Sequence, residues 1–566
     1  MRRTPLLALV VATACARPPQ AIAPAQPGLF GPSSQPVLLP PRFGEPGLPR
    51  TDADWRAVGR EATALLSQYV AINTTNPPGN ELKTAEWLKA VLAREGITAQ
   101  IFEPGPGKAN LYARVAGDGS ARPLILLNHM DVVLATPEYW KVDPFAGTVQ
   151  DGYLWGRGAL DMKGEAITQL MTLLTLKRAG VALKRDVIFL ATADEEVGAG
   201  VGAAWMVEHH PELVQDAEFL LTEGGTIRAG PTGRIEYYGV GATEKSPFWL
   251  EVTARGTAGH GSRPTPDNPV HRLVRALNRI ASYQTPLVVT PAVERYLRDL
   301  STIEPDPVRR AWLADVRAAL RDSAAVRALT GDLTYNALLR NTISITGLTG
   351  SDKTNVIPPV ARAALDVRLL PGQDPQAFLA ELVRVVADTA VAITPLGPSW
   401  PATESPTDTE LFRSIVAAAR ERAPNALVTT PPLTGFTDSH YFRQLGIVSY
   451  GLSPFPLTQT ESRGVHGNDE RVSLDDVTFG VHFVYDVVSR VVAKSSGCSS
   501  IRGATHRRGS GVRRCSSGSP RRAWAGWWSA WPRRSRAGRT RGSRLLRSRS
   551  RCATWTPGSS ATASRS

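Results

Sequence analysis

The first half of the chain alternates between amphipathic stretches and short apolar runs. Helix-like stretches cover 55–72, 84–95 and 162–179, and apolar runs of strand length lie at 123–127, 187–191 and 219–221. Short apolar strands separated by helices are typical of an α/β layer structure with mostly parallel strands. We therefore expect residues 51–245 to form the first part of an α/β domain.

The pattern changes near residue 246. Strand-like runs at 248–254, 342–348 and 361–369, with a helix at 376–389, predict a smaller α+β domain over 246–397, in which 291–329 form a charged, helical insertion. After a proline-rich stretch, alternation of helix and strand resumes over 398–496. The simplest interpretation is that the α+β domain is inserted into the α/β domain.

The N-terminus has the pattern of an export signal. Arg2 and Arg3 precede an apolar run at 6–14, about half of the roughly 18 residues that a membrane span requires. Cleavage at an Ala-x-Ala site ending at Ala23 predicts a signal peptide over 1–23, a Pro/Gly-rich linker over 24–50 and a periplasmic or secreted protein. Cys15 offers the alternative of a lipoprotein, although Ala12 stands where a larger aliphatic residue is usual.

The net charge of +14 would suggest a nucleic-acid partner if it were spread along the chain. However, 17 of the 65 basic residues lie in 497–566, which contain no acidic residue, so the preceding part carries 48 basic and 51 acidic residues. We therefore expect no nucleic-acid partner for the folded part.

The basic tail at 497–566 has low complexity and no apolar periodicity, and it holds three of the four cysteines. Arginine, serine, glycine and tryptophan without lysine or acidic residues are what GC-rich DNA gives when it is read out of frame, so we interpret the tail as a frameshift product. The alternative is a disordered basic arm that binds nucleic acid or anionic lipid.

Between Cys15 and Cys498 there is no cysteine, so histidine and carboxylate must supply any metal ligands. Such residues gather in five clusters, most of them directly after or closing a predicted strand: His129 with Asp131, Asp161, Glu195 with Glu196, Glu223, and His466. Each cluster alone could be a surface turn or a helix cap. Because ligands of open α/β sheets bind beyond the carboxyl ends of strands, the clusters together predict a site for a pair of divalent metals.

In the order of these clusters and in the residues around them, the sequence resembles the M20 family of metallopeptidases and aminoacylases over residues 55–495. The segments 140–163 and 220–225 are most similar to the branch of Gly-Xaa carboxypeptidases and N-acyl-amino-acid hydrolases. The resemblance implies a mostly parallel-sheet di-metal hydrolase domain, with 246–397 as an inserted α+β lid and dimerisation domain. It also implies a homodimer formed through that lid.

The resemblance also implies roles for single residues. Asp161 would bridge two divalent ions, expected to be zinc, with cobalt or manganese as alternatives. His129 and Glu223 would complete one site, and Glu196 and His466 the other. Some relatives have aspartate where this chain has Glu223. Glu195 would be the general base. Independently of the resemblance, Asp131 lies two residues after His129, close enough to orient this histidine or a neighbour.

In the lid, His260 matches a histidine that polarises the substrate carbonyl from the partner subunit. Asn355 and Arg368 match positions linked to substrate binding. The planar donor fork of Arg368 suits a free carboxylate, although an ordinary ion pair on a strand is the alternative. His440 stands where relatives often have another basic residue, and its role stays open.

We therefore expect an exported di-zinc hydrolase that cleaves the amide bond of small peptides or N-acyl amino acids with a free carboxylate. The sequence leaves open whether it is a dipeptidase, a carboxypeptidase or an aminoacylase. A non-catalytic peptide-binding protein on the same fold is the alternative, but it would be expected to have lost the base or a ligand. A dinucleotide pattern at 198–203 is disfavoured because Asp194, Glu195 and Glu196 would face the pyrophosphate.

Overall fold

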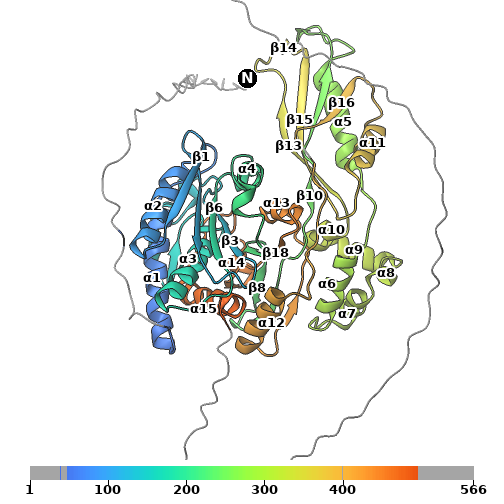
Figure 1. Ribbon diagram of the computed structural model, residues 1–566. Coiled ribbons are helices and arrows are strands. Elements are labelled where there is room, and N and C mark those ends of the chain that lie inside the picture. Colours follow the sequence, from blue (N-terminus) through green and yellow to red (C-terminus); the bar gives the residue numbers. More distant parts are fainter. Residues whose placement is uncertain (1–38, 40–47, 398, 495–566) are drawn as a thin grey trace, which may run out of the picture. The chain divides into compact units, whose positions relative to one another are not determined.

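The computed structural model describes residues 39, 48–397 and 399–494 (Figure 1). The predicted signal peptide, most of the linker and the basic tail lie outside these residues. Among the described helices, none combines the length and the apolar character that crossing a membrane would need.

A six-stranded sheet with the order β1-β2-β6-β3-β7-β18 forms the centre of the larger domain (Figure 1). Neighbours among the last four strands run parallel, whereas β1 and β2 form an antiparallel hairpin that joins β6. This arrangement confirms the predicted α/β fold with a mostly parallel sheet. The strands are β1 (Ala99–Gly105), β2 (Lys108–Val115), β3 (Leu124–His129), β6 (Val187–Thr192), β7 (Phe219–Thr222) and β18 (Val448–Gly451).

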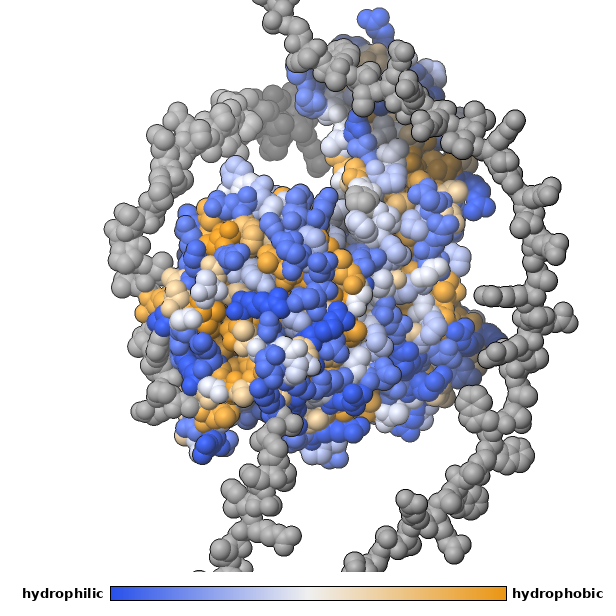
Figure 2. All heavy atoms as spheres, viewed as in Figure 1, coloured by the Kyte–Doolittle hydropathy of each residue, from blue (hydrophilic) through white to orange (hydrophobic). Residues whose placement is uncertain are grey.

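The central strands are apolar throughout because both of their faces are covered. Leu124 and Leu126 of β3 belong to the core under α1 (Asp52–Ala71), α2 (Glu81–Arg94), α3 (Lys163–Arg178), α12 (Glu410–Arg422) and α15 (Leu474–Val492). Ile125 and Leu127 point to the other face, where α4 (Ala203–His209) and α13 (Ser439–Gln444) pack. The face of the molecule visible in Figure 2 is largely hydrophilic, with apolar residues in smaller patches.

Parallel strands bring their carboxyl ends to one edge of the sheet. His129 is the last residue of β3, Glu195 and Glu196 follow β6 within four residues, and Glu223 directly follows β7. Asp161 lies just before α3, whose observed start at Lys163 agrees with the predicted helix at 162–179. The fold thus gathers the predicted acidic and histidine clusters at one edge.

A second, antiparallel sheet has its own core and confirms the predicted α+β region. Its order is β10-β15-β11-β16, with β13 also paired to β15. The helices α5 (Pro269–Ser282) and α11 (Pro375–Val386) pack on it through residues such as Leu277 and Phe378. The strands are β10 (Ser246–Pro247), β11 (Leu250–Arg255), β13 (Thr342–Thr349), β15 (Val360–Leu369) and β16 (Val391–Pro395), and β12 (Gly259–His260) pairs with β14 (Val356–Ile357).

The helical insertion predicted at 291–329 forms four helices, the last of which ends at Gly331, and a fifth helix follows it. The five helices share a core with Tyr237 of β9 (Ile235–Gly239). These helices therefore pack against the larger domain, although the chain enters them from the second sheet. They are α6 (Pro291–Ser301), α7 (Pro307–Ala314), α8 (Val316–Ala319), α9 (Ser323–Gly331) and α10 (Leu333–Leu338).

Two small sheets and four short helices complete the larger domain. One sheet joins β17 (Leu427–Thr429), β9, β8 (Thr226–Ala229) and β19 (Pro456–Leu457), and the other joins β20 (Arg471–Ser473), β5 (Tyr153–Trp155) and β4 (Thr148–Gln150). The short helices are η1 (Pro137–Tyr139), η2 (Glu195–Val197), η3 (Pro211–Leu213) and α14 (Gln459–Ser462).

Candidate metal centre and active site

The carboxylate of Asp161 lies between two imidazoles. Its Oδ1 is 3.2 Å from Nε2 of His129, and its Oδ2 is 3.1 Å from Nε2 of His466. His129 comes from the end of β3, and His466 comes from the loop after α14. Because each oxygen faces a different histidine, one carboxylate can serve two ligand groups.

Each histidine also has a glutamate of its own. Oε2 of Glu196 lies 3.1 Å from Nε2 of His466, and Oε2 of Glu223 lies 3.8 Å from Nε2 of His129. The structure thus brings together all five residues that the sequence analysis assigned to the metals. Among the described residues, two groups of possible ligand atoms lie within 4.8 Å of one another, and both contain His129. One group adds Glu195 and Glu223, and the other adds Asp161 and Glu196.

The electrostatics of this cluster suit bound cations. Burial raises the pKa of Glu223 to about 7, and the charge of Asp161 adds to the shift. Burial likewise raises the pKa of Glu196, whose Oε1 is buried without a hydrogen-bond partner. Buried carboxylates that repel one another are costly unless a cation neutralises them. The nitrogen and oxygen donors fit zinc and similar divalent ions.

The contacts between histidine and carboxylate shift the pKa values of His466 and Asp161 in favour of their charged forms. Hydrogen bonds to Asp161 and Glu196 raise the pKa of His466 to about 10. Burial alone would raise the pKa of Asp161, but hydrogen bonds to His129 and His466 outweigh it and leave that pKa lowered. A proton on the ring nitrogen of His466 thus takes the role that a metal cation would have in neutralising these carboxylates.

Glu195 opens the helical turn η2 and lines a cavity beside the metal cluster. Burial, reinforced by the charge of Glu223, raises the pKa of its carboxyl group well above the usual value. A carboxylate with a raised pKa is a stronger base, which is the property that general-base catalysis needs.

Asp131 is fully buried and holds the backbone of this turn. Its Oδ1 accepts a hydrogen bond from the N–H of Glu195, and its Oδ2 accepts one from the N–H of Glu196, both at 3.2 Å. Nδ1 of His129 lies 3.0 Å from the backbone carbonyl oxygen of Asp131 and 3.5 Å from its carboxylate. Of the two predicted roles, orienting a neighbour is thus the one that the side chain performs most directly.

The cavity beside the metal cluster has a volume of about 390 Å³, and four aromatic side chains form part of its lining, which we call the aromatic wall. Arg368 lines it together with Glu195, Glu196 and His466. Arg368 is also ion-paired: its Nε donates to Oδ1 of Asp366 at 2.7 Å, and its Nη2 donates to Oδ2 at 3.2 Å. One edge of the guanidinium thus binds Asp366, which is not a lining residue, while the Arg368 side chain lines the cavity. The aromatic lining residues are Trp249, Trp400, Phe436 and Tyr441.

His260 and Asn355 lie together, but they are not among the residues lining this cavity. The N–H of Gly261 donates to the carbonyl of Asn355 at 2.7 Å, next to the pairing of β12 with β14. Both side chains are exposed, and Nδ1 of His260 is 2.7 Å from Oγ of Ser262. Within one chain, the structure therefore does not bring these two predicted residues to the metal cluster.

Two features near the site were not predicted from the sequence. Asp438 is buried, accepts a hydrogen bond from Thr192 at 2.9 Å, and has a pKa that burial raises to about 7. The aromatic wall is the second feature, because isolated aromatic residues in loops carry no motif. His440 is fully buried behind this wall, against Trp400 and Phe436, and burial lowers its pKa to about 4.

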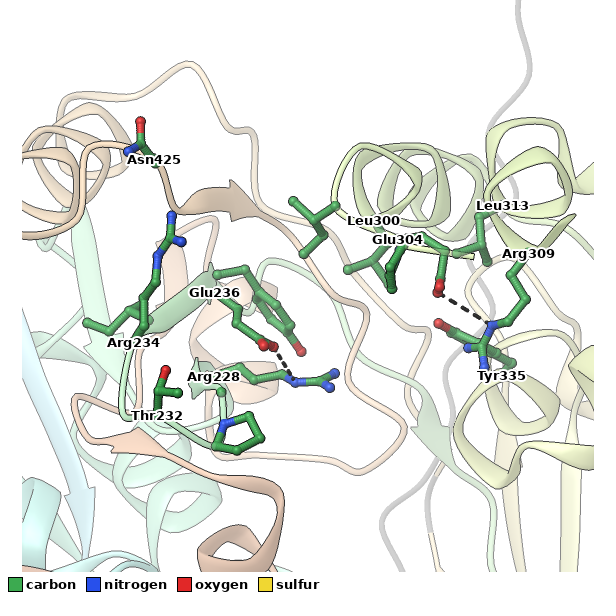
Figure 3. A pocket seen from close by; sticks show the side chains of 16 residues that line it. Arg228, Thr232, Arg234, Glu236, Leu300, Glu304, Arg309, Leu313, Tyr335 and Asn425 are labelled. Carbon is green, nitrogen blue, oxygen red and sulfur yellow. Dashed lines mark ion pairs between the residues drawn. The ribbon is translucent and has the colours of Figure 1, made fainter. Parts of the chain in front are cut away.

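A larger cavity, of about 680 Å³, lies between the β8–β9 hairpin and the inserted helices (Figure 3). Two ion pairs occupy its lining, Arg228 with Glu236 at 3.1 Å and Arg309 with Glu304 at 3.4 Å. No histidine lines it. The candidate metal-binding groups contain His129, Glu195, Glu196 and Glu223, and Glu195 and Glu196 line the smaller cavity.

The sheet-edge site and the separate antiparallel sheet define a metallohydrolase. The family model described as "Peptidase family M20/M25/M40" matches residues 125–490. The chain belongs to this family and is an M20 metallopeptidase/aminoacylase-type hydrolase.

Sequence relatives include N-fatty-acyl-amino acid synthase/hydrolase PM20D1 of Xenopus tropicalis, which is 30% identical over 389 residues, covering 68% of this chain and 75% of the relative. Aminoacylase-1 of Sus scrofa is 28% identical over 424 residues, covering 73% and 92%.

Solved structures support the fold. The M20 family metallo-carboxypeptidase Sso-CP2 from Sulfolobus solfataricus matches with a TM-score of 0.59 at 20% identity, over 76% of this chain and 98% of that chain. Human carnosine dipeptidase 1 matches with a TM-score of 0.58 at 15% identity, over 77% and 97%. At these identities the likeness establishes the fold alone.

Proposed function

We propose that this protein is a two-metal amide hydrolase that acts on small peptides or N-acyl amino acids with a free carboxylate. The observation that carries the proposal is the position of Asp161, whose two oxygens face His129 and His466 at 3.2 and 3.1 Å. A bridging carboxylate of this kind is the feature that a dinuclear site requires.

In this proposal, His129 and Glu223 would hold one ion, Glu196 and His466 would hold the other, and Asp161 would contribute to both sites. Zinc is the expected metal, with cobalt or manganese as alternatives. When bound, such ions polarise the amide carbonyl and lower the pKa of water towards neutrality.

Glu195 is the proposed general base. Its raised pKa equips it to take a proton from the attacking water and to deliver that proton to the leaving amine. Asp131 supports this role through its hydrogen bond from the N–H of Glu195. The retained base and the complete ligand set argue against a non-catalytic peptide-binding protein.

Arg368 is the proposed anchor for the substrate carboxylate. Because Asp366 occupies the Nε and Nη2 positions, Nη1 remains available in the cavity that also contains Glu195. The aromatic wall offers an apolar surface for the rest of the substrate. This combination favours N-acyl amino acids with apolar groups, in keeping with the names of the PM20D1 and aminoacylase relatives.

We further propose that the protein is exported and acts as a homodimer through the second sheet. The apolar run at 6–14 supports export. His260 is at the end of β12 and Asn355 directly precedes β14, and both side chains are exposed, which supports a role for these residues toward a partner subunit.

The test is hydrolysis of a panel of N-acyl amino acids and dipeptides, with and without a chelator, by the wild type and by Glu195→Gln. We expect chelator-sensitive cleavage that the variant loses while it still binds metal. Cleavage that survives both the chelator and the substitution would refute the proposal.

A further inference from the structure

We infer that Lys108 and Asn76, neither of which belongs to the metal cluster, are positioning residues for Glu195 and Glu196. This inference rests on the proposed function. The two residues join Asp194 and Asp131 in a hydrogen-bonded network behind the catalytic turn.

Lys108, the first residue of β2, uses all three of its ammonium donors within this network. Its Nζ donates to Oδ1 of Asn76 at 3.1 Å, to Oε1 of Glu81 at 3.0 Å and to Oδ1 of Asp194 at 2.9 Å. Only 16% of the Lys108 side chain is exposed, and Glu81 is fully buried. The ammonium group of Lys108 therefore connects β2 to the segment 76–81 and to Asp194, which are distant from one another in the sequence.

Asn76 connects this cation to the carboxylates that face the site. Its Nδ2 donates to Oδ2 of Asp131 and to Oδ1 of Asp194, both at 2.8 Å. The neighbours fix the orientation of the amide, because a flipped amide would turn its NH₂ group towards the ammonium of Lys108 and its oxygen towards two carboxylates. The amide thus joins Lys108 to Asp131 with a defined direction.

The other end of the network holds the turn itself. Asp194 has a left-handed backbone with φ 68°, which is uncommon for a residue other than glycine, and its carbonyl accepts the N–H of Val197 at 3.3 Å. Asp131 accepts the N–H groups of Glu195 and Glu196, as described above. The orientation of the base and of one metal ligand therefore depends on Asp194 and Asp131. Asn76 donates to both of these carboxylates, and Lys108 donates to Asp194 and to Asn76.

The packing around Lys108 leaves little room for an alternative arrangement. A Cβ atom at Gly79 would lie 2.4 Å from Nζ of Lys108 and 2.4 Å from the carboxylate of Glu81, and Gly79 has a φ of 96°. A side chain at this position would displace the ammonium. The glycine thus keeps the loop close to the network.

Small displacements of a reacting group strongly lower the reaction rate. Residues that support metal ligands typically contribute about 10- to 100-fold to metal affinity or activity. Loss of this network should therefore lower kcat and zinc affinity without changing substrate binding. A network that only stabilised the fold would lower the melting temperature and leave both quantities unchanged.

The test compares Lys108→Met, Lys108→Arg and Asn76→Ser with the wild type, all as full chains. Lys184→Met is the matched control, because Lys184 is also partly buried and is ion-paired with Glu410 at 2.6 Å. Lys184 precedes the N-terminal end of β6, whereas the catalytic turn follows its C-terminal end. The measurements are kcat, KM, melting temperature, and zinc affinity of the metal-free protein in competition with a chromophoric chelator.

We expect Asn76→Ser and Lys108→Met to lower kcat and zinc affinity about 10-fold or more, with KM within about threefold of the wild type. Lys108→Arg should recover part of the loss, and Lys184→Met should match the wild type. Wild-type kcat and zinc affinity in folded Asn76→Ser would overturn the inference, whether or not Lys108→Met folds. If the wild type hydrolyses no substrate, the proposed function fails, and the zinc affinities alone decide the inference.

Discussion

Asp161 and His466 lie 3.1 Å apart through Oδ2 and Nε2, although one precedes α3 and the other follows α14. This contact joins the two histidine groups of the cluster, since the other oxygen of Asp161 faces His129. In the proposed function, both metal positions therefore depend on Asp161.

Asp161→Asn should therefore reduce bound zinc from two ions per chain to one or fewer, because the amide is a weak replacement for a bridging carboxylate. The loss of kcat should exceed the roughly 10- to 100-fold that is typical of residues that only support ligands. Metal analysis of the dialysed protein, beside the activity assay, checks both effects.

The control for that experiment is Asp151→Asn. Asp151 is exposed and has a left-handed backbone with φ 53°, which asparagine tolerates. Two zinc ions per chain in Asp161→Asn would contradict the bridging role.

Zinc binding should release protons at pH 7. Hydrogen bonds to Asp161 and Glu196 raise the pKa of His466 to about 10, and burial raises that of Glu223 to about 7. Both groups thus hold protons that a metal must displace, so zinc affinity should rise as the pH increases through about 7. Calorimetry in buffers of different ionisation enthalpy measures the released protons, and a binding enthalpy independent of the buffer would speak against this set of ligands.

Arg368→Met should raise KM for substrates with a free carboxylate by about 10- to 100-fold, the usual worth of a hydrogen bond to a charged group. The same substrates with an amidated carboxyl group should be affected much less. Arg362→Met is the matched control, because Arg362 lies on the same strand and is ion-paired with Glu251. Equal losses for free and amidated substrates would show that Arg368 does not bind the carboxylate.

His260 offers a test of the proposed dimer. Glu195→Gln and His260→Ala should each be inactive, because one lacks the base and the other lacks the proposed carbonyl donor. If His260 acts on the partner subunit, mixed dimers contain one intact site, and an equal mixture should regain about a quarter of wild-type activity after subunit exchange. A mixture that remains inactive after verified exchange would exclude action across the dimer.

The sequence predicted the features that are local in the chain. His129 ends an apolar strand, and Glu195 and Glu223 follow apolar strands within three residues, so the strand pattern and the parallel sheet are enough to place them together. Leu126→Ala tests the same pattern: the residue is fully buried, and its truncation should lower the free energy of unfolding by about 2–5 kcal/mol in a denaturant titration. Truncation of the exposed Leu333 should have little effect.

The features that sequence reasoning missed depend on contacts between distant segments. Lys108 reaches Asp194 across 86 positions, and no local pattern marks either residue as a partner of the other. Trp249 and Phe436 come from different segments and meet only at the cavity wall. The same limit applies to the inserted helices, whose packing against Tyr237 depends on how the chain returns from the second sheet.

The most direct measurement is a zinc titration of the metal-free protein followed by hydrolysis of an N-acyl amino acid. Activity should be absent without metal, should increase with added zinc, and should reach its plateau at two ions per chain. Full activity without metal, or a plateau at one ion per chain with no further binding, would contradict a two-metal hydrolase built around Asp161.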